Sequence, residues 1–326
     1  MEGLSVVTGS SGYVGYALVK HLCAFGCRPR LLLRGRRSYL EEFGCESVKG
    51  DVLDYPSLCL AFEGASVVYH AAGLIDVAGG RDNDVWEVNV VGTANVVRAC
   101  KACGVKRLIY LSSVDAIPPL PEPQIMQEID YFTPTAVSGT YAKTKATATQ
   151  LVLDSATNDF SVVCMHPSAV CGPYDYVVSS FGTMVRMCVK GAFPVTMDFG
   201  GYNFVDTRDV AAGCAAAADS AVPSGCYILS GEYMTCSEMI ATLSELTGHQ
   251  PPKIVLSKSI ATAASYPADQ YYKLLKKTPL FTPYSIRKLC ENGQFSHEKA
   301  SRELGFQPRS ARESLTDMIA WIRSQK

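Results

Sequence analysis

The amino-acid sequence predicts an α/β protein built on a doubly wound parallel sheet, followed by a smaller C-terminal α/β part. Two observations predict this fold class. Short apolar runs alternate with helical patterns through the first half of the chain, and a glycine-rich turn follows the first apolar run. Such alternation is typical of parallel strands joined by right-handed crossover helices.

The expected strands and helices follow one another along the chain. Strands buried on both faces are short, continuous apolar runs, whereas helices show apolar residues at three-four spacing. The predicted strands span residues 4–9, 28–34, 45–52, 65–72, 105–113 and 160–168. The predicted helices span residues 13–26, 55–64, 85–104 and 141–155, and the first ends at Gly26.

The pattern loosens after Pro167, where proline and glycine become frequent. Residues 203–222 resemble a return to the sheet followed by an alanine-rich helix. We therefore expect a dinucleotide-binding domain of residues 1–165 plus 203–222. The expected substrate-binding domain comprises residues 166–202 plus 223–326.

Composition narrows the function classes. Of 326 residues, 48% are hydrophobic and 19% are charged, and the net charge is -1. This balance favours a small-molecule substrate over nucleic acid or anionic lipid. Neither a signal peptide nor a membrane-spanning run is apparent, and the thirteen scattered cysteines are expected to be reduced, so a cytoplasmic location is predicted. The five histidines are dispersed, and no metal site is expected.

The glycine-rich turn "TGSSGYVG" predicts a phosphate site. Gly9, Gly12 and Gly15 follow a predicted strand and open a predicted helix. Backbone without Cβ atoms can turn sharply and bring a pyrophosphate to the helix N-terminus, where free N–H groups favour anions. The alternative is a plain tight turn, but the strand-turn-helix context favours nucleotide binding on a Rossmann-type sheet.

Three arginines indicate which dinucleotide is bound. An acidic residue at the end of the second strand would favour NAD, but this position holds Arg34, followed by Arg36 and Arg37. Guanidinium groups suit a 2′-phosphate, which favours NADP over NAD, although a solvated surface loop would explain the same charges. Asp51, at the end of the third strand, could accept a hydrogen bond from the adenine amino group.

A tyrosine and a lysine stand four positions apart in "TYAKTKATATQ". At this spacing Tyr141 and Lys145 project from one face of a helix. A neighbouring ammonium group lowers the pKa of a phenol, which would make it a general acid or base for an alcohol-carbonyl pair. Ser112 and Ser113 end the fifth strand, where a hydroxyl could hold the substrate oxygen. The alternative is an exposed tyrosine stacked on a lysine stem.

With these motifs in order, the chain resembles the extended short-chain dehydrogenases/reductases. "HAAG", "NVVGT", "YLSSV", "YAKTK", "HPSAVCGP" and "NFVDTRDVA" carry the resemblance, together with the glycine turn. It implies that Ser113, Tyr141 and Lys145 are catalytic and that Asn89 is structural. It also implies cofactor contacts at Gly9, Ser11, Gly12, Tyr13, Val14, Gly15, Arg34, Arg37, Asp51, Val52, Ala71, Ala72, Gly73, Tyr141, Lys145, Pro167 and Val170. Family members often dimerise through two helices, so a homodimer through the helices from Val85 and Tyr141 is open to this chain.

Three branches of this superfamily compete. "HAAGLIDVAG" and "IYLSSVDAIPP" resemble the 3β-hydroxysteroid dehydrogenase and dihydroflavonol 4-reductase branch. Nucleotide-sugar epimerases and dehydratases carry an asparagine where this chain has His166 and an arginine where Gly201 and Tyr202 stand. Residues 193–204 and 271–284 are rich in aromatic and aliphatic side chains, which suits an apolar ligand. The expectation is an NADP-dependent oxidoreductase for a bulky, steroid- or flavonoid-like ketone or alcohol; the alternatives are sugar-nucleotide chemistry and a non-catalytic NADP(H)-binding protein.

Overall fold

A seven-stranded parallel sheet forms the larger part of the molecule. The computed structural model describes residues 3–76, 81–219, 221–274 and 282–325. Every pairing between neighbouring strands of this sheet is parallel. The strands lie in the order β10 (Gly225–Leu229), β6 (Ser161–Pro167), β5 (Arg107–Leu111), β4 (Ala65–His70), β1 (Leu4–Thr8), β2 (Arg30–Leu33) and β3 (Ser47–Lys49). The predicted fold class is therefore confirmed.

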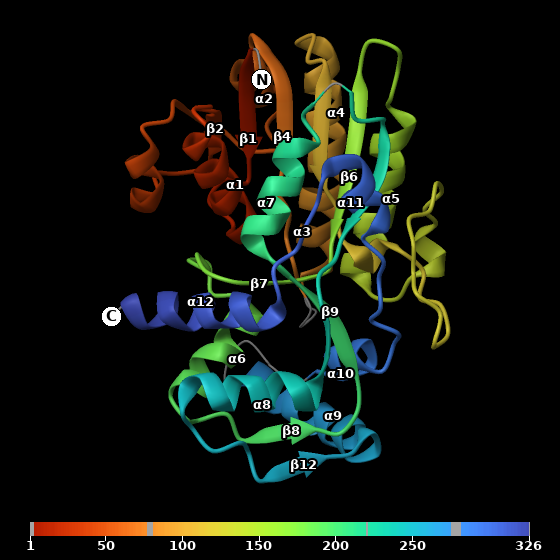
Figure 1. The fold of residues 1–326 in the computed structure, drawn as a ribbon. Coiled ribbons are helices and arrows are strands. Elements are labelled where there is room, and N and C mark those ends of the chain that lie inside the picture. The colour runs from red at the N-terminus through yellow and green to blue at the C-terminus, as the bar shows by residue number, and fades with distance from the viewer. Residues whose placement is uncertain (1–2, 77–80, 220, 275–281, 326) are drawn as a thin grey trace.

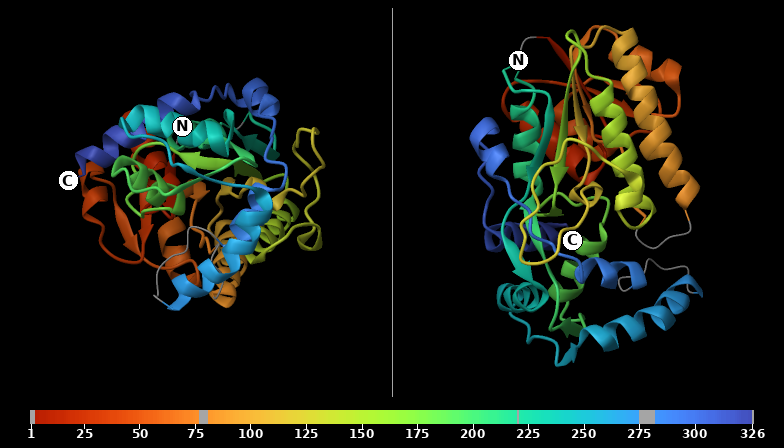
Figure 2. Two further views of the ribbon diagram at one scale, coloured as in Figure 1. Left: turned by 90° about the horizontal axis from the view of Figure 1, so that it is seen from below. Right: turned by 90° about the vertical axis from the view of Figure 1, so that its right-hand side faces the viewer.

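Helices cover both faces of this sheet (Figures 1 and 2). One face carries α1 (Tyr13–Ala24), α7 (Thr207–Ala216) and α11 (Glu298–Leu304), and the other carries α2 (Tyr55–Phe62), α4 (Gly92–Ala102) and α5 (Thr140–Asp154). Successive strand residues point to opposite faces, so Val6 packs in the core under α2, α4 and α5 while Val7 packs in the core under α1 and α7. The central strands are therefore largely apolar on both faces, whereas the edge strand β3 is partly exposed.

Short elements connect the strands to these helices. The predicted helix 85–104 begins earlier, as α3 (Asp82–Trp86), and passes through one π-helical turn, η2 (Glu87–Val91), before α4. Single 3₁₀ turns follow β2, follow β5 and precede α5. They are η1 (Ser38–Phe43), η3 (Val114–Ala116) and η4 (Pro134–Ala136).

A smaller three-stranded sheet connects the large sheet to the rest of the chain. Its strands lie in the order β11 (Tyr233–Thr235), β9 (Gly201–Asp206) and β7 (Ala169–Cys171). Residues 203–206, expected to return to the large sheet, thus belong to β9 in this second sheet. Conversely, residues 225–229 were expected in the substrate domain, but they form the edge strand β10 of the large sheet because their apolar side chains are buried against β6 and the surrounding helices.

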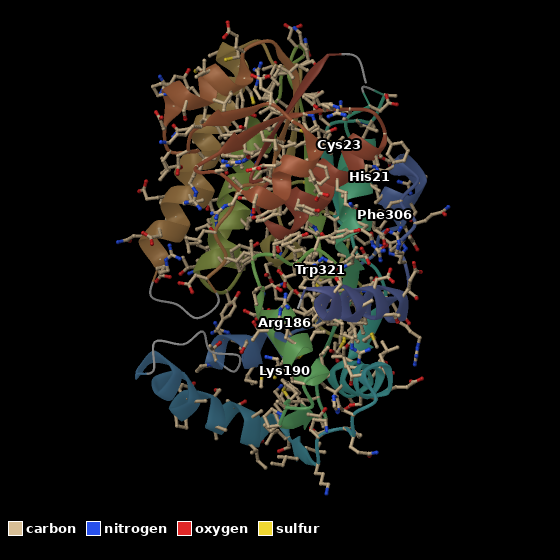
Figure 3. All side chains as sticks on the ribbon, turned by 90° about the vertical axis from the view of Figure 1, so that its left-hand side faces the viewer. His21, Cys23, Arg186, Lys190, Phe306 and Trp321 are labelled. Carbon is tan, nitrogen blue, oxygen red and sulfur yellow. The ribbon has the colours of Figure 1, made fainter. Side chains whose placement is uncertain are left out.

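The remaining elements gather below the large sheet in Figure 1. They are α6 (Ser180–Val189), β8 (Val195–Met197), α8 (Cys236–Thr247), β12 (Ile254–Leu256), α9 (Lys258–Leu274), α10 (Pro283–Leu289) and α12 (Ala311–Ser324). Val185, Leu243 and Leu315 form the core that joins α6, α8 and α12. Beside that core, the guanidinium carbon of Arg186 lies 5.6 Å from the ring centre of Trp321 (Figure 3).

Candidate active site

The glycine turn between β1 and α1 is shaped by close backbone contacts. Gly9 has a φ of 72°, and a Cβ there would collide with the backbone of Ala71 and Ala72. A Cβ on Gly15 would collide with the carbonyl group of Gly9. Gly12 is the N-cap of α1 and carries no capping side chain, so the first-turn N–H groups are open to an anion. This geometry fits the predicted pyrophosphate site.

Tyr13 and Tyr39 connect this turn to the rest of the molecule. The Tyr13 hydroxyl donates a 2.5 Å hydrogen bond to the carbonyl O of Gly172, so its phenol faces the segment after β7. Tyr39 donates to the carbonyl O of Ser11 at 2.9 Å, and its ring stacks on Tyr176 with 4.5 Å between centroids. The phenols of both tyrosines are therefore engaged with protein groups.

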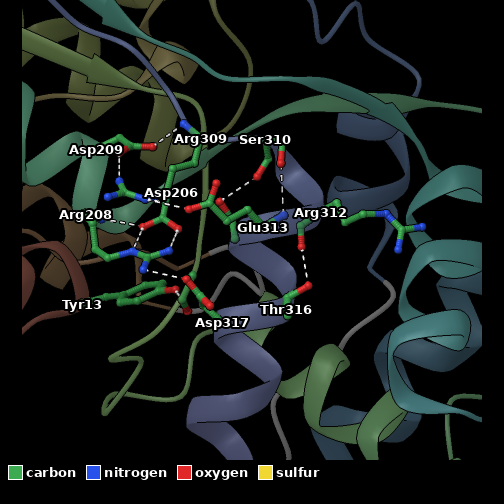
Figure 4. Close-up of polar contacts among 12 residues, drawn as sticks. Tyr13, Asp206, Arg208, Asp209, Arg309, Ser310, Arg312, Glu313, Thr316 and Asp317 are labelled. Carbon is green, nitrogen blue, oxygen red and sulfur yellow. Dashed lines mark hydrogen bonds and ion pairs between the residues drawn. The ribbon is translucent and has the colours of Figure 1, made fainter.

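An ion-pair network lies beside Tyr13 and connects β9 to α12 (Figure 4). The Asp206 carboxylate accepts two hydrogen bonds from Arg208, at 2.8 and 2.7 Å. The third nitrogen of the Arg208 guanidinium group lies 2.7 Å from Asp317 on α12. Because Asp206 is buried, this fork fixes the end of β9 against α12 and supports the segment that Tyr13 contacts.

The three predicted arginines after β2 differ in their partners. Arg36 forms a double hydrogen bond with Glu41. Arg34 and Arg37 are exposed and form no ion pair within the described part of the chain. Arg34 and Arg37, the two arginines predicted to contact the cofactor, thus keep guanidinium groups that are free to bind a phosphate.

The ends of β3 and β4 place the other predicted cofactor contacts. Asp51 accepts a hydrogen bond from the N–H of Leu53, which uses one carboxylate oxygen. Val52 is buried against Gly92 at the start of α4. Ala71 N–H donates to the carbonyl O of Thr8, which holds residues 71–73 beside the glycine turn. These residues therefore follow the carboxyl ends of the parallel strands, on the same side of the sheet as the glycine turn.

Hydrogen bonds of the Asn89 side chain connect the segment after β4 to helix α5. Its amide oxygen accepts from the N–H of Leu74 at 2.8 Å, and its amide nitrogen donates to the carbonyl O of Leu74 and to Thr144. Gly73 lies next to it, and a Cβ there would be 3.4 Å from both the Asn89 amide oxygen and Lys145 Nζ. Asn89 acts structurally, in keeping with the role that the resemblance implied.

Tyr141 and Lys145 share the inward face of α5. Their exposed fractions are 8% and 5%, which excludes the exposed pair considered from the sequence. Lys145 Nζ donates to the carbonyl O of Leu111, the last residue of β5, at 2.7 Å and lies 5.0 Å from the ring centre of Tyr110. Helix α5 is thus joined to the strand that leads into Ser113.

The structure distinguishes the two serines after β5. Ser112 is buried and its hydroxyl lies 2.6 Å from that of Thr149, inside the sheet-helix interface. Ser113 is the N-cap of η3, where its hydroxyl oxygen accepts from the N–H of Asp115, and it is close enough to Tyr141 to lower the pKa of the phenol. Ser113 is the one that meets the tyrosine.

One expectation about the site electrostatics is wrong in this structure. The sequence predicted that Lys145 would lower the pKa of Tyr141. Burial instead raises the pKa of Tyr141 above its usual value, Asp115 raises it further, and the nearby Ser113 hydroxyl lowers it. Burial also lowers the pKa of Lys145 to about 7. Because both groups are buried, the loss of hydration changes their pKa values more than the charge of a neighbour four residues away does.

A comparison with protein-family models shows to which family this chain belongs. The model of the 3-beta hydroxysteroid dehydrogenase/isomerase family matches residues 6–218, a span that holds the glycine turn, Ser113, Tyr141 and Lys145. The chain belongs to this family. As the sequence predicted, this 3-beta hydroxysteroid dehydrogenase/isomerase family member is an NAD(P)-dependent oxidoreductase.

Individual members extend the similarity over the whole chain. Sterol demethylase protein B of Methylococcus capsulatus is 29% identical over 98% of this chain and 98% of its own length. The 3beta-hydroxysteroid-dehydrogenase/decarboxylase isoform 1 of Arabidopsis thaliana is also 29% identical, over 94% of this chain and 76% of its own. The crystal structure of gox2253 is 30% identical with a TM-score of 0.85, covering 99% of this chain and 98% of that one.

Several residues of this family member reach the site without having been predicted. Asp115, two residues after Ser113, lies 3.1 Å from Lys288 Nζ of α10, and α10 also places Tyr284 against Gly139 at the start of α5. His166 is buried, with its ring stacked on Phe132, and lies 2.9 Å from the carbonyl O of Ser113. The run "LSSVDA" could have indicated Asp115, but nothing near the motifs points to α10.

Two further findings concern this family member as a whole. Among the residues that the structure describes, no cluster of three histidine, cysteine or acidic side chains could hold a metal ion. Within the same residues, no helix combines the length and the apolar character needed to span a bilayer. The predicted apolar segment 271–284 lies partly outside the described residues, since 275–281 are not among them.

Proposed function

We propose that this chain is an NADP-dependent oxidoreductase that interconverts a ketone and a secondary alcohol on a bulky, largely apolar substrate of steroid or flavonoid type. One observation carries the proposal: Tyr141 and Lys145 are buried together on α5, and Ser113 is close enough to the tyrosine to lower the pKa of its phenol. A buried phenol with a hydroxyl beside it suits the oxygen atom of an alcohol-carbonyl pair.

The proposed roles follow from hydrogen-bond capacity. Ser113 Oγ accepts from Asp115 N–H, so its own proton is free to point at a substrate oxygen. In ketone reduction Tyr141 gives its proton to that oxygen as the carbonyl carbon gains a hydride. NADPH would supply this hydride and leave as NADP⁺. Lys145 donates to the carbonyl O of Leu111 and, at 3.5 Å, to the Tyr110 hydroxyl, which leaves one N–H for the ribose hydroxyls.

Arg34 and Arg37 support NADP within this proposal. Both are exposed beyond the end of β2, where a 2′-phosphate would lie on a sheet of this kind, and both lack a carboxylate partner in the described residues. Arg36 is already paired with Glu41 and would contribute less. NAD remains the alternative cofactor.

The substrate class is supported by family and by the site. Two similar proteins are named for sterol or hydroxysteroid chemistry. His166 stands where sugar-nucleotide enzymes carry an asparagine anchor, and it is buried against Phe132. That position therefore offers little to a sugar diphosphate. The retained tyrosine and lysine argue against a non-catalytic NADP(H)-binding role, and a homodimer through α4 and α5 stays a prediction.

A cofactor-oxidation screen tests the proposal. The purified chain would be mixed with NADPH or NADH and with panels of steroid ketones, flavonoid ketones, small aldehydes and UDP- or dTDP-sugars. We expect NADPH consumption with the polycyclic ketones. Turnover confined to the sugar nucleotides would replace the proposed substrate class, and binding of NADPH without turnover of any panel would favour the non-catalytic alternative.

A further inference from the structure

Asp115 contacts the predicted catalytic serine on one side and two residues from later in the chain, Lys288 and Tyr202, on the other. Its main-chain N–H donates to the Ser113 hydroxyl oxygen at 3.1 Å. Its carboxylate lies 3.1 Å from Lys288 Nζ and 3.5 Å from the Tyr202 hydroxyl. A carboxylate two residues after the predicted catalytic serine is thus held by helix α10, which lies more than half of the chain further along the sequence.

Lys288 reaches this carboxylate from α10. In Figure 1, α10 lies between the large sheet above and the elements β8 and β12 below. The side chains of Lys288 and Asp115 are only 18% and 23% exposed, so water screens this pair less than it would screen a surface pair. Glu291 lies 2.9 Å from the same ammonium group. Burial lowers the pKa of Lys288, but Asp115 and Glu291 raise it more, so this lysine stays charged.

The groups around Tyr141 come from four elements. Asp115 and Ser113 belong to η3 and its N-cap, which packs against α5; Tyr284 of α10 lies against the start of α5, and Tyr110 of β5 lies beside Lys145, one turn along α5. Asp115 is the carboxylate among them. A negative charge beside a phenol makes loss of the phenolic proton harder, so whatever neutralises Asp115 acts on Tyr141.

We propose that Lys288 is a positioning residue for the proton transfer: its ammonium group holds the Asp115 carboxylate and offsets the negative charge that Tyr141 meets when it ionises. This inference rests on the proposed role of Tyr141. The inference adds helix α10 to the site, although α10 contains none of the sequence motifs that predicted the site. The substrate-side helix α10 would thereby adjust the acid-base group of the nucleotide-side sheet.

The pH dependence of alcohol oxidation tests this role, because Tyr141 must be deprotonated to accept the alcohol proton. The assay follows NADP⁺ reduction with a 3β-hydroxysteroid, or with the alcohol product of whichever ketone the screen selects. Lys288→Met should move the rising limb of kcat/KM to higher pH by about one unit, since it exposes Tyr141 to an unpaired carboxylate. Asp115→Asn should move the limb to lower pH, and Lys288→Arg should keep it near the wild-type position.

Two controls separate this role from a purely structural one. Lys143→Met removes an exposed cation from α5 itself and should leave the limb in place. In an Asp115→Asn background, Lys288→Met should cause no further shift, because the charge it acts through is gone. A Lys288→Met enzyme with lower kcat but an unmoved limb would overturn the inference. Full activity of Tyr141→Phe would instead overturn the proposed function on which it rests.

Discussion

Lys145 on α5 donates a hydrogen bond to the carbonyl O of Leu111 on β5, with 2.7 Å between the two atoms. The bond joins the helix that carries Tyr141 to the strand that ends just before Ser112 and Ser113. Because Lys145 is buried, its charge costs free energy of folding that the bond only partly offsets. The arrangement keeps an ammonium group at the site at the expense of stability.

The first prediction concerns the pH dependence of this cost. Burial lowers the pKa of Lys145 to about 7 in the folded chain, below its usual value near 10.5. Between these values the unfolded chain binds more protons than the folded one, so this residue makes stability rise with pH from about 7 to about 10. The contribution is at most about 1.4 kcal/mol per pH unit. Urea unfolding at pH 7, 8 and 9 should show this rise in the wild type and a flatter curve in Lys145→Met; equal slopes would contradict the assignment.

His70 should have an effect of the same sign at lower pH, because burial lowers its pKa as well. Thr93 donates its hydroxyl proton to Asn89, so His70 Nε2 donates to Thr93 and Nδ1 accepts from Thr8, which satisfies the neutral ring. Burial, followed by Lys145, lowers the pKa of His70 to about 3.

This depressed pKa means that His70 contributes stability above pH 6.5 and that the contribution is lost as the pH falls from 6.5 toward 3. Between pH 6 and 4, His70→Gln should therefore lose stability less steeply than the wild type, by up to about 1.4 kcal/mol per pH unit. The free energy of unfolding, measured at three pH values in that range, checks this. A variant as steep as the wild type would show that another group causes the acid sensitivity.

Cofactor preference is predicted to depend on Arg34 and Arg37 and much less on Arg36. Arg34→Asp should lower the NADP/NAD ratio of kcat/KM at least tenfold, because an acidic group repels a 2′-phosphate and accepts from a 2′-hydroxyl. Arg37→Ala should lower the ratio by a smaller factor. Arg36→Ala is the matched control, since its guanidinium group is paired with Glu41. An unchanged ratio in Arg34→Asp would remove the basis for NADP.

Gly139 at the start of α5 is predicted to be required for two reasons. Its φ is 91°, and a Cβ there would press on the ring of Tyr284. Gly139→Ala should cost about 2–4 kcal/mol of stability, as the sum of backbone strain and overpacking. Gly26→Ala is the matched control, because Gly26 has a φ of 78° but open space around its Cβ position, so its cost should be only about 1–2 kcal/mol. Thermal unfolding of both variants measures the difference; equal losses would exclude the contact with Tyr284.

The large sheet and the central residues of the site could be predicted from the sequence for a local reason. The central strands of that sheet are largely apolar runs, and Gly9, Ser113 and Tyr141 belong to short motifs next to predicted strand or helix ends. The edge strand β10 was placed in the wrong part because Pro223 and Gly225 precede a short run that pairs only with β6. Lys288 could not be found, and Tyr284 was named only as part of the apolar segment 271–284, since their approach to Asp115 and Gly139 depends on how distant elements pack.

The pKa of Tyr141 is another property that the sequence alone could not predict. Helical spacing correctly placed Tyr141 and Lys145 on one face, but their burial depends on the core between α5 and the sheet. Desolvation then raises the pKa of the phenol, opposite to what the spacing suggested. Electrostatics in a closed site depends on what surrounds a pair as much as on the distance between its members.

Tyr141→Phe tests the role of the phenol most directly, with two measurements on one protein: turnover of the ketone that the screen selects and the dissociation constant for NADPH from fluorescence titration. The variant keeps the ring and removes only the hydroxyl. We expect turnover to fall by about 10³-fold or more while NADPH affinity stays within a few-fold, since loss of a positioned proton donor slows the reaction strongly. A variant that reduces the ketone at the wild-type rate, with NADPH bound as before, would show that Tyr141 is not the proton donor.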